Sequence, residues 1–85
     1  MEASDVIIHP LLSEKSMRLI DENTIVLLVS EKAKKADIAS AVSELYGKKV
    51  KNVRTVKTVL NRKKAYVTLI EKNAAADVAA KLGML

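Results

Sequence analysis

The residue types that could support catalysis are few in this chain. Among its 85 residues it has one histidine, two glycines and no cysteine, which excludes disulfides, thiolate metal sites and glycine-rich phosphate loops. His9 has no partner that the sequence identifies, and a histidine beside Pro10 is more often a structural or phosphate-contacting residue than a general base. Glu14, Asp21 and Glu22 are most simply exposed residues at the two ends of a helix. We therefore predict a protein that is not an enzyme and has no metal, cofactor or small-molecule substrate.

The basic residues offer a different chemistry, because they gather in one part of the sequence. Residues 48–69 hold eight of the fifteen lysines and arginines and no acid. Residues 1–31 carry six acids and two bases, whereas residues 32–64 carry eleven bases and two acids. Such segregation is typical of a protein that binds a polyanion with one face and leaves another face free. The simpler alternative is a solvated, lysine-rich surface without function.

Length and composition indicate one small domain, residues 1–85. Hydrophobic residues make up 49% of the chain, which favours a folded core over disorder. No apolar run approaches the roughly 20 residues that span a bilayer, and the acidic first residues do not resemble a signal peptide. We expect a soluble, intracellular protein that does not insert into a membrane.

Apolar periodicity predicts the elements of the first half of the chain. A brief edge strand over residues 6–8 should close at His9-Pro10. Ser13 should cap a short helix that ends near Asp21, and residues 24–30, apolar on both faces, should form a central strand. Gly47 should end the clearest helix, which carries the apolar residues 38–46.

A hairpin and a last helix follow. Residues 49–60 and 64–71 are predicted strands joined by a tight turn at Asn61–Lys63, and a bulge near Asn52 would explain the broken alternation of the first strand. Asn73 should cap a helix over residues 74–82, with Gly83 as its stop. The residues expected on the buried sides of the three helices are Leu12, Ser16, Met17 and Ile20; Ile38, Ala41, Val42, Leu45 and Tyr46; and Val78, Ala79 and Leu82.

The element order β-α-β-α-β-β-α predicts an α+β fold, a small and mainly antiparallel sheet with helices packed on it. A twisted, two-stranded ribbon that carries lysine and arginine can follow the backbone of a nucleic acid. No helix looks like a DNA-recognition helix, so RNA is favoured. Base stacking needs two or three aromatic side chains on one face, but Tyr46 should lie in the core and Tyr66 alone is a poor platform. Phosphate and shape recognition should therefore dominate, with basic residues opposite the helices and at the turn.

Three segments together resemble a known family. They are HPLLSEKSMRLIDENTIVLLV (residues 9–29), KKADIASAVSELYGKKVKNVRTV (residues 34–56) and KKAYVTL (residues 63–69). Their motifs Pro-x-x-Ser-Glu-Lys, Ile-x-x-Ala-Val-x-x-Leu-Tyr and Lys-Lys-Ala-Tyr-Val, in this order, are similar to those of the universal large-subunit ribosomal protein twenty-three family. The resemblance covers nearly the whole chain, from about Val6 to Leu85.

The resemblance implies a cytoplasmic, structural constituent of the large ribosomal subunit. Such a protein binds domain III of the large-subunit rRNA near the polypeptide exit tunnel, beside other ribosomal proteins. It also implies a docking surface for the signal recognition particle, or in bacteria trigger factor, with Glu14 as the docking acid. With the basic stretch, it gives a predicted set of rRNA-binding residues: His9, Lys15, Lys32, Lys34, Lys35, Lys48, Lys49, Lys51, Asn52, Arg54, Thr55, Lys57, Arg62, Lys63, Lys64 and Tyr66.

The chain departs from the family pattern in two places. Bacterial members carry a long loop between the last two strands that reaches into the tunnel, whereas the short connection here resembles the archaeal form. Many relatives have Asn-Thr where this chain has Arg54-Thr55, so a charge replaces an amide. Two alternatives stay open: a non-ribosomal RNA-binding module that acts through a basic β-hairpin, and a ligand-sensing or dimerising α+β domain whose basic face is incidental.

Overall fold

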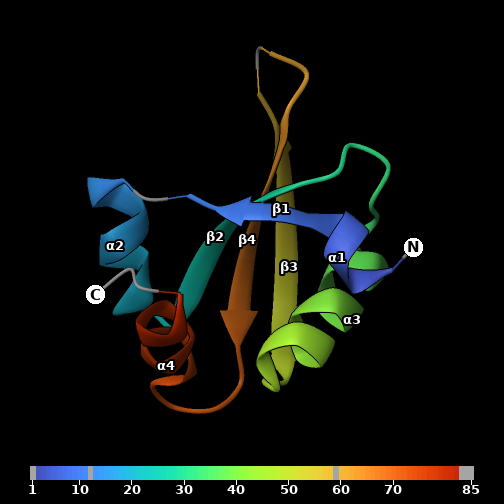
Figure 1. Ribbon diagram of the computed structural model, residues 1–85. Helices are drawn as coiled ribbons and strands as arrows, with labels where there is room; N and C mark the ends of the chain where they lie inside the picture. The colour runs from blue at the N-terminus through green and yellow to red at the C-terminus, as the bar shows by residue number, and fades with distance from the viewer. Residues whose placement is uncertain (1, 12, 59, 83–85) are drawn as a thin grey trace.

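A four-stranded antiparallel sheet with the strand order β1-β2-β4-β3 lies at the centre of the computed structural model (Figure 1). The structure describes residues 2–11, 13–58 and 60–82. The elements are α1 (Ala3–Val6), β1 (Ile7–Pro10), α2 (Glu14–Ile20), β2 (Thr24–Val29), α3 (Lys35–Tyr46), β3 (Val50–Lys57), β4 (Lys63–Leu69) and α4 (Ala74–Lys81). The predicted α+β class is confirmed, and the predicted order of elements along the chain matches apart from the additional helix α1.

The core lies between one face of this sheet and the helices α1, α3 and α4. Strand β2 supplies Ile25, Leu27 and Val29, and β4 supplies its odd-numbered residues from Ala65 onward, all of them almost completely buried. Small and β-branched helix residues close the core from the other side: Ala3, Val6, Ile38, Ala41, Val42, Ala74, Ala75, Val78 and Ala79. All six residues of β2 are buried, which explains why this strand is apolar on both faces.

Several local predictions are confirmed in detail. The Ser13 side chain accepts a hydrogen bond from the backbone N–H of Ser16 at the start of α2. Gly47 ends α3 in the left-handed conformation, with φ of 67°, which costs glycine little because it has no Cβ. The strand register shifts between Val50 and Asn52, where the bulge was expected.

The N-terminal segment corrects one prediction. Val6 belongs to the short helix α1, which the sequence did not predict, and the strand after it runs on to Pro10. Proline is tolerated there because β1 is an edge strand, whose outer side makes no ladder hydrogen bonds. The helix forms because Ala3 and Val6, three residues apart, both bury their side chains in the core.

The hairpin connection is also longer than expected. Strand β3 ends at Lys57 and β4 begins at Lys63. Asn61 and Arg62 lie in the connection, as predicted, but Lys63 belongs to β4, and the first strand ends before the predicted residue 60. The backbone N–H of Thr58 donates to the carbonyl oxygen of Arg62 at 2.7 Å, and Asn61 has a positive φ of 56°. Both features bend the chain before Lys63, which is then free to pair with Lys57 in the ladder.

Two helix residues predicted to be buried are exposed. Met17 is 43% exposed and Leu45 is 47% exposed. In the last turn of α3 it is Tyr46 that packs against the core, so the neighbouring Leu45 is directed outward. Leu82 is only partly buried, and the predictions for Leu12 and Gly83 lie outside the described residues.

The cap of α4 comes from a distant residue instead of from Asn73. Asn73 has a φ of 63° and makes no side-chain capping bond. A capping side chain reaches the first backbone N–H groups of a helix when its own backbone is extended, and the backbone of Asn73 is left-handed instead. Instead, Oδ1 of Asn23 accepts from the backbone N–H of Ala75 at 2.9 Å. Nδ2 of Asn23 donates to the carbonyl oxygens of Leu69, at 2.8 Å, and Glu71, at 2.6 Å. One side chain thereby joins the turn before β2, the end of β4 and the start of α4.

Candidate nucleic-acid interface

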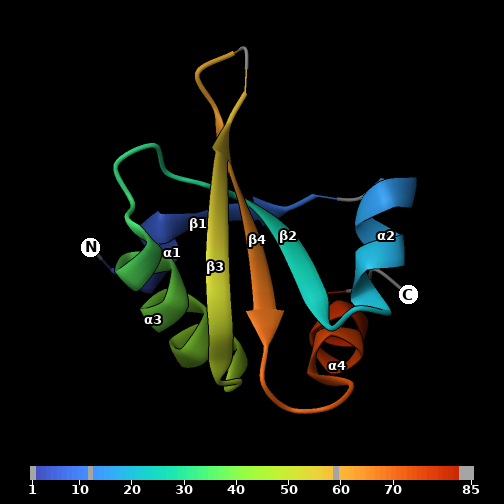
Figure 2. The same cartoon turned by 180° about the vertical axis from the view of Figure 1, so that it is seen from behind.

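The sheet face turned away from α1, α3 and α4 carries much of the predicted site, and we call it the open face. Figure 2 shows strands β2, β3 and β4 from this side with no helix in front of them. Cross-strand pairing aligns Arg54 with Tyr66 and Tyr66 with Val26. The residues of the open face are Val26, Leu28, Asn52, Arg54, Val56, Lys64, Tyr66 and Thr68.

Arg54 and Tyr66 form a stacked pair at the centre of the open face. The guanidinium carbon of Arg54 lies 4.8 Å from the centre of the Tyr66 ring, a distance at which the cation is attracted to the ring face. Arg54 is exposed, and it makes no salt bridge within residues 2–11, 13–58 and 60–82. Its charge is therefore available to an anion.

Tyr66 lines two hollows, one shared with Lys64 and the other with Thr68, the residues two positions before and after it on β4. Leu11, Ser13, Lys15, Ser16, Leu19, Val26 and Lys64 line the first hollow with it, where α2 meets the sheet. Leu19, Glu22, Thr24, Asn52, Arg54 and Thr68 line the second. The sequence did not single out Thr68 as a site residue, although strand alternation puts it on the same face as Tyr66.

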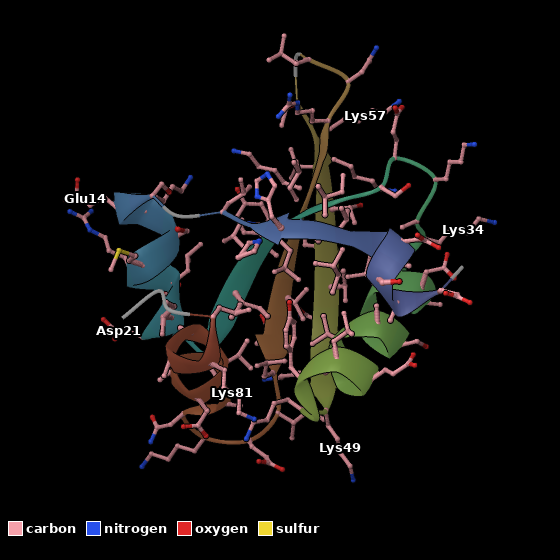
Figure 3. The ribbon with its side chains drawn as sticks, in the orientation of Figure 1. Glu14, Asp21, Lys34, Lys49, Lys57 and Lys81 are labelled. Carbon is pink, nitrogen blue, oxygen red and sulfur yellow. The ribbon has the colours of Figure 1, made fainter. Side chains whose placement is uncertain are left out.

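The β3–β4 hairpin extends beyond the rest of the sheet (Figure 1). A second group of bases belongs to this end of the hairpin and to the segment between β2 and the start of α3. We call this region the hairpin end; its residues are Lys32, Lys34, Lys35, Lys57, Arg62 and Lys63. Nζ of Lys63 donates to the carbonyl oxygen of Ala33 at 2.7 Å, so the hairpin is fastened to the loop that carries the other lysines. Figure 3 shows Lys34 and Lys57 toward the same end of the molecule.

His9 lies beside the hairpin end in mixed surroundings. It lines a hollow with Arg62 and Asn61, but Asp5 and Glu31 line the same hollow. Its Nδ1 is 2.9 Å from the carbonyl oxygen of Pro10. A phosphate near His9 would therefore be attracted by Arg62 and repelled by Asp5 and Glu31.

Four predicted site residues are not gathered with the others. Nζ of Lys48 lies 3.4 Å from Asp77 and 3.9 Å from Glu71, with its side chain only 17% exposed. Thr55 pairs with the buried Ala65 and is half-buried on the helix-covered face. Lys49 lies at the opposite end of the molecule from Lys57 (Figure 3). The fourth residue, Lys51, is exposed at the bulge of β3.

Glu14, the first residue of α2, and Asp21, its C-cap, lie on a different side from the hairpin end (Figure 3). The side chain of Glu14 is 87% exposed, and its Oε1 is 3.2 Å from Nη2 of Arg18. An exposed pair of this kind contributes little to stability. Glu14 is therefore accessible to a partner.

Other kinds of site find no support in the residues that the structure describes. They contain no group of three or more histidine, cysteine or acidic residues that could hold a metal ion, and none of their helices is long and apolar enough to cross a membrane. Burial raises the pKa of Tyr46 by desolvation, in keeping with its place against the core. This shift belongs to packing rather than to a reactive site.

Similarity to known proteins identifies the family. A family model described as ribosomal protein L23 matches residues 5–76. The chain belongs to the ribosomal protein L23 family. The large ribosomal subunit protein uL23 of Methanococcus maripaludis is 47% identical over 85 residues, which cover 99% of both chains. The uL23 proteins of Methanococcus aeolicus and Methanococcus vannielii are each 45% identical over the same share.

Membership in the L23 family confirms the resemblance drawn from the three sequence segments, including its archaeal character. It makes the chain a ribosomal protein with a structural role. The match over the full length of the relatives agrees with the short hairpin connection. The ligand-sensing domain and the free RNA-binding module are therefore disfavoured.

Proposed function

We propose that this protein is a structural constituent of the large ribosomal subunit that binds domain III of the large-subunit rRNA near the polypeptide exit tunnel. Its relatives are large-subunit proteins of nearly the same length. In this proposal the open face and the hairpin end contact rRNA, other ribosomal proteins lie alongside, and α2 stays accessible to factors that act on the nascent chain. The rRNA positions the protein through phosphate contacts rather than through a recognition helix.

The observation that carries the proposal is the separation of charge in three dimensions. Arg54 and Lys64 lie on the open face. Lys64 is the second residue of β4, so it lies next to the hairpin end with Lys57 and Arg62. One folded RNA could contact this surface and still leave Glu14 and Asp21 exposed at the two ends of α2. Each phosphate that a lysine or arginine neutralises releases counterions, which favours binding at low salt.

Two of the residues predicted from the sequence have other roles in this proposal. Lys48 is paired with two acids of its own chain, and Thr55 lies on the covered face. We assign neither of them a contact with rRNA. Lys49 and Lys51, both exposed, stay predicted phosphate contacts outside the central surface.

Binding to a domain III rRNA fragment tests the RNA half of the proposal. The protein and the fragment are mixed across a salt series beside an unrelated structured RNA of equal length. Domain III should stay bound at salt concentrations that release the control, because shape and many positioned phosphates add to plain charge attraction. Equal and steeply salt-sensitive binding to both RNAs would contradict the proposal and leave only a generic basic surface.

Glu14→Gln tests the docking half. The variant should bind domain III like the original protein, because Glu14 lies away from the proposed RNA surface. Large subunits reconstituted with it should bind the signal recognition particle several-fold more weakly, since one exposed charge pair contributes on the order of 1 kcal/mol or less. Asp21→Asn, at the C-cap of the same helix, is the matched control and should bind normally. Loss of rRNA binding by Glu14→Gln would disprove the two-surface arrangement.

A further inference from the structure

The two hollows beside Tyr66 have different chemistry. The first brings Lys15 and Lys64 to one side of the ring. The second has amide, hydroxyl and guanidinium groups from Asn52, Thr68 and Arg54. A ligand that covers Tyr66 therefore meets cations on one side and neutral hydrogen-bonding groups beside Arg54 on the other.

Arg54 and Tyr66 supply two planar groups, since Tyr66 lines both hollows and Arg54 lines the second. The guanidinium carbon of Arg54 lies over the ring, 4.8 Å from its centre, and Arg54 is an exposed residue. Unpaired bases of RNA stack on aromatic rings and on arginine planes alike. The two residues face each other across the β3–β4 ladder, and Val26, buried, flanks Tyr66 on β2. The strands thus hold this pair in place before any ligand binds.

The position of Glu22 favours a nucleobase over an acidic peptide as the ligand of the second hollow. It lines the second hollow, where its carboxylate would repel an acidic peptide. The exocyclic amino group of a nucleobase, in contrast, is a donor that a carboxylate accepts. A nucleotide has one anionic end and one neutral end that carries donors, and this polarity matches the two hollows.

From this geometry we propose that the open face holds one unpaired nucleotide of the bound RNA. Its phosphate lies by Lys15 and Lys64, its base stacks on the Arg54–Tyr66 pair, and the edge of the base meets Asn52, Thr68 and Glu22. The inference rests on the proposed rRNA-binding function and adds to it a specific nucleotide site. Because Tyr66 is the aromatic residue of this face, the site takes a single base and not a row of stacked bases.

Tyr66→Leu tests the site, with Tyr66→Phe as its matched variant. Leucine keeps an apolar side chain on β4 but removes the ring, whereas phenylalanine keeps the ring. Stacking of one base is worth about 1–3 kcal/mol, so Tyr66→Leu should lower affinity for the domain III fragment about 5- to 150-fold. The salt dependence should not change, because no charge is removed. Chemical probing of the RNA should find one unpaired nucleotide exposed by Tyr66→Leu and still protected by Tyr66→Phe.

The outcomes separate this site from the function on which it rests. Normal affinity and an unchanged footprint for Tyr66→Leu, with domain III still bound, would overturn the nucleotide site alone. Failure of the original protein to bind domain III would overturn both. Thermal unfolding shows whether Tyr66→Leu folds. If it does not fold, Arg54→Gln is tested in its place, because Arg54 is exposed. Arg54→Gln should expose the same nucleotide, and an unchanged footprint would overturn the site.

Discussion

The two ends of the β3–β4 hairpin use the same kind of residue in opposite ways. At the hairpin end, Lys57 and Arg62 are exposed and make no salt bridge in the described part of the chain. At the other end, which we call the α4 end, Lys48 is paired with Glu71 and Asp77, and Asn23 makes three side-chain hydrogen bonds. Lysines that look alike in the sequence thus differ in what they contribute.

The difference follows from which neighbours the fold provides. The α4 end brings three separate segments together, and their polar groups satisfy one another there. At the hairpin end the hairpin extends beyond the rest of the sheet (Figure 2). Its bases form no salt bridge within the residues that the structure describes, although Asp5 and Glu31 line the hollow beside Arg62. Polar residues at the α4 end should therefore affect stability, whereas those at the hairpin end should affect RNA binding.

Asn23→Ala should give the largest effect on stability. Each hydrogen bond contributes about 0.5–1.5 kcal/mol, so loss of three should lower the free energy of unfolding by about 2–4 kcal/mol. Urea denaturation measures this change. Asn73→Ala is the control, since Asn73 also has a positive φ but makes no side-chain capping bond. If both variants were destabilised by the same amount, the backbone conformation and not the Asn23 bonds would hold the α4 end together.

Neutralising the hairpin end should give the largest effect on RNA binding. Replacing Lys57 and Arg62 together with alanine should reduce the slope of log affinity against log salt by about two, close to one for each phosphate that the variant no longer neutralises. The control replaces Lys72 and Lys81, which removes the same charge far from the hairpin; Figure 3 shows Lys81 at the opposite end of the molecule from Lys57. Equal slopes for the two variants would mean that total charge, not position, governs binding.

Lys48→Met should have a smaller effect, and on stability alone. Methionine keeps an apolar stem but breaks the pairs with Asp77 and Glu71, whose side chains are 60% and 62% exposed. Solvent screens such pairs, so the free energy of unfolding should fall by less than about 1 kcal/mol. The salt dependence of RNA binding should match that of the original protein. A slope reduced by about one would show that Lys48 leaves its acids to contact RNA.

The smallest effect should come from Tyr46, which ends α3 two residues before Lys48. Burial raises its pKa, so the folded state holds the phenol proton more tightly than the unfolded chain does. Its contribution to stability is complete below the unfolded pKa of about 10 and is lost as the pH rises through the folded value. Stability measured at pH 9 and pH 11 should fall less in Tyr46→Phe than in the original protein. An equal fall would contradict a buried phenol.

The sequence by itself determined the α+β class, the central strand β2, the helix α3 with its stop at Gly47, and the bulge of β3. These features depend on local signals: apolar periodicity, a residue that tolerates positive φ, and a break in alternation. The family motifs likewise identified a ribosomal protein. The small helix α1 and the exposure of Leu45 escaped prediction, because both depend on which side chains the core accepts.

Only the tertiary structure decided which charged side chains are available to bind RNA. Pairing of β3 with β4 put Arg54 and Tyr66 on the open face and turned Thr55, one residue away, toward the helices. The packing of α4 brought Asp77 to Lys48, 29 residues apart, and Ala75 to Asn23, 52 residues apart. The composition gives the number of charged residues. Whether each charge is neutralised or exposed depends on contacts between residues far apart in the sequence, and a local sequence pattern does not contain that information.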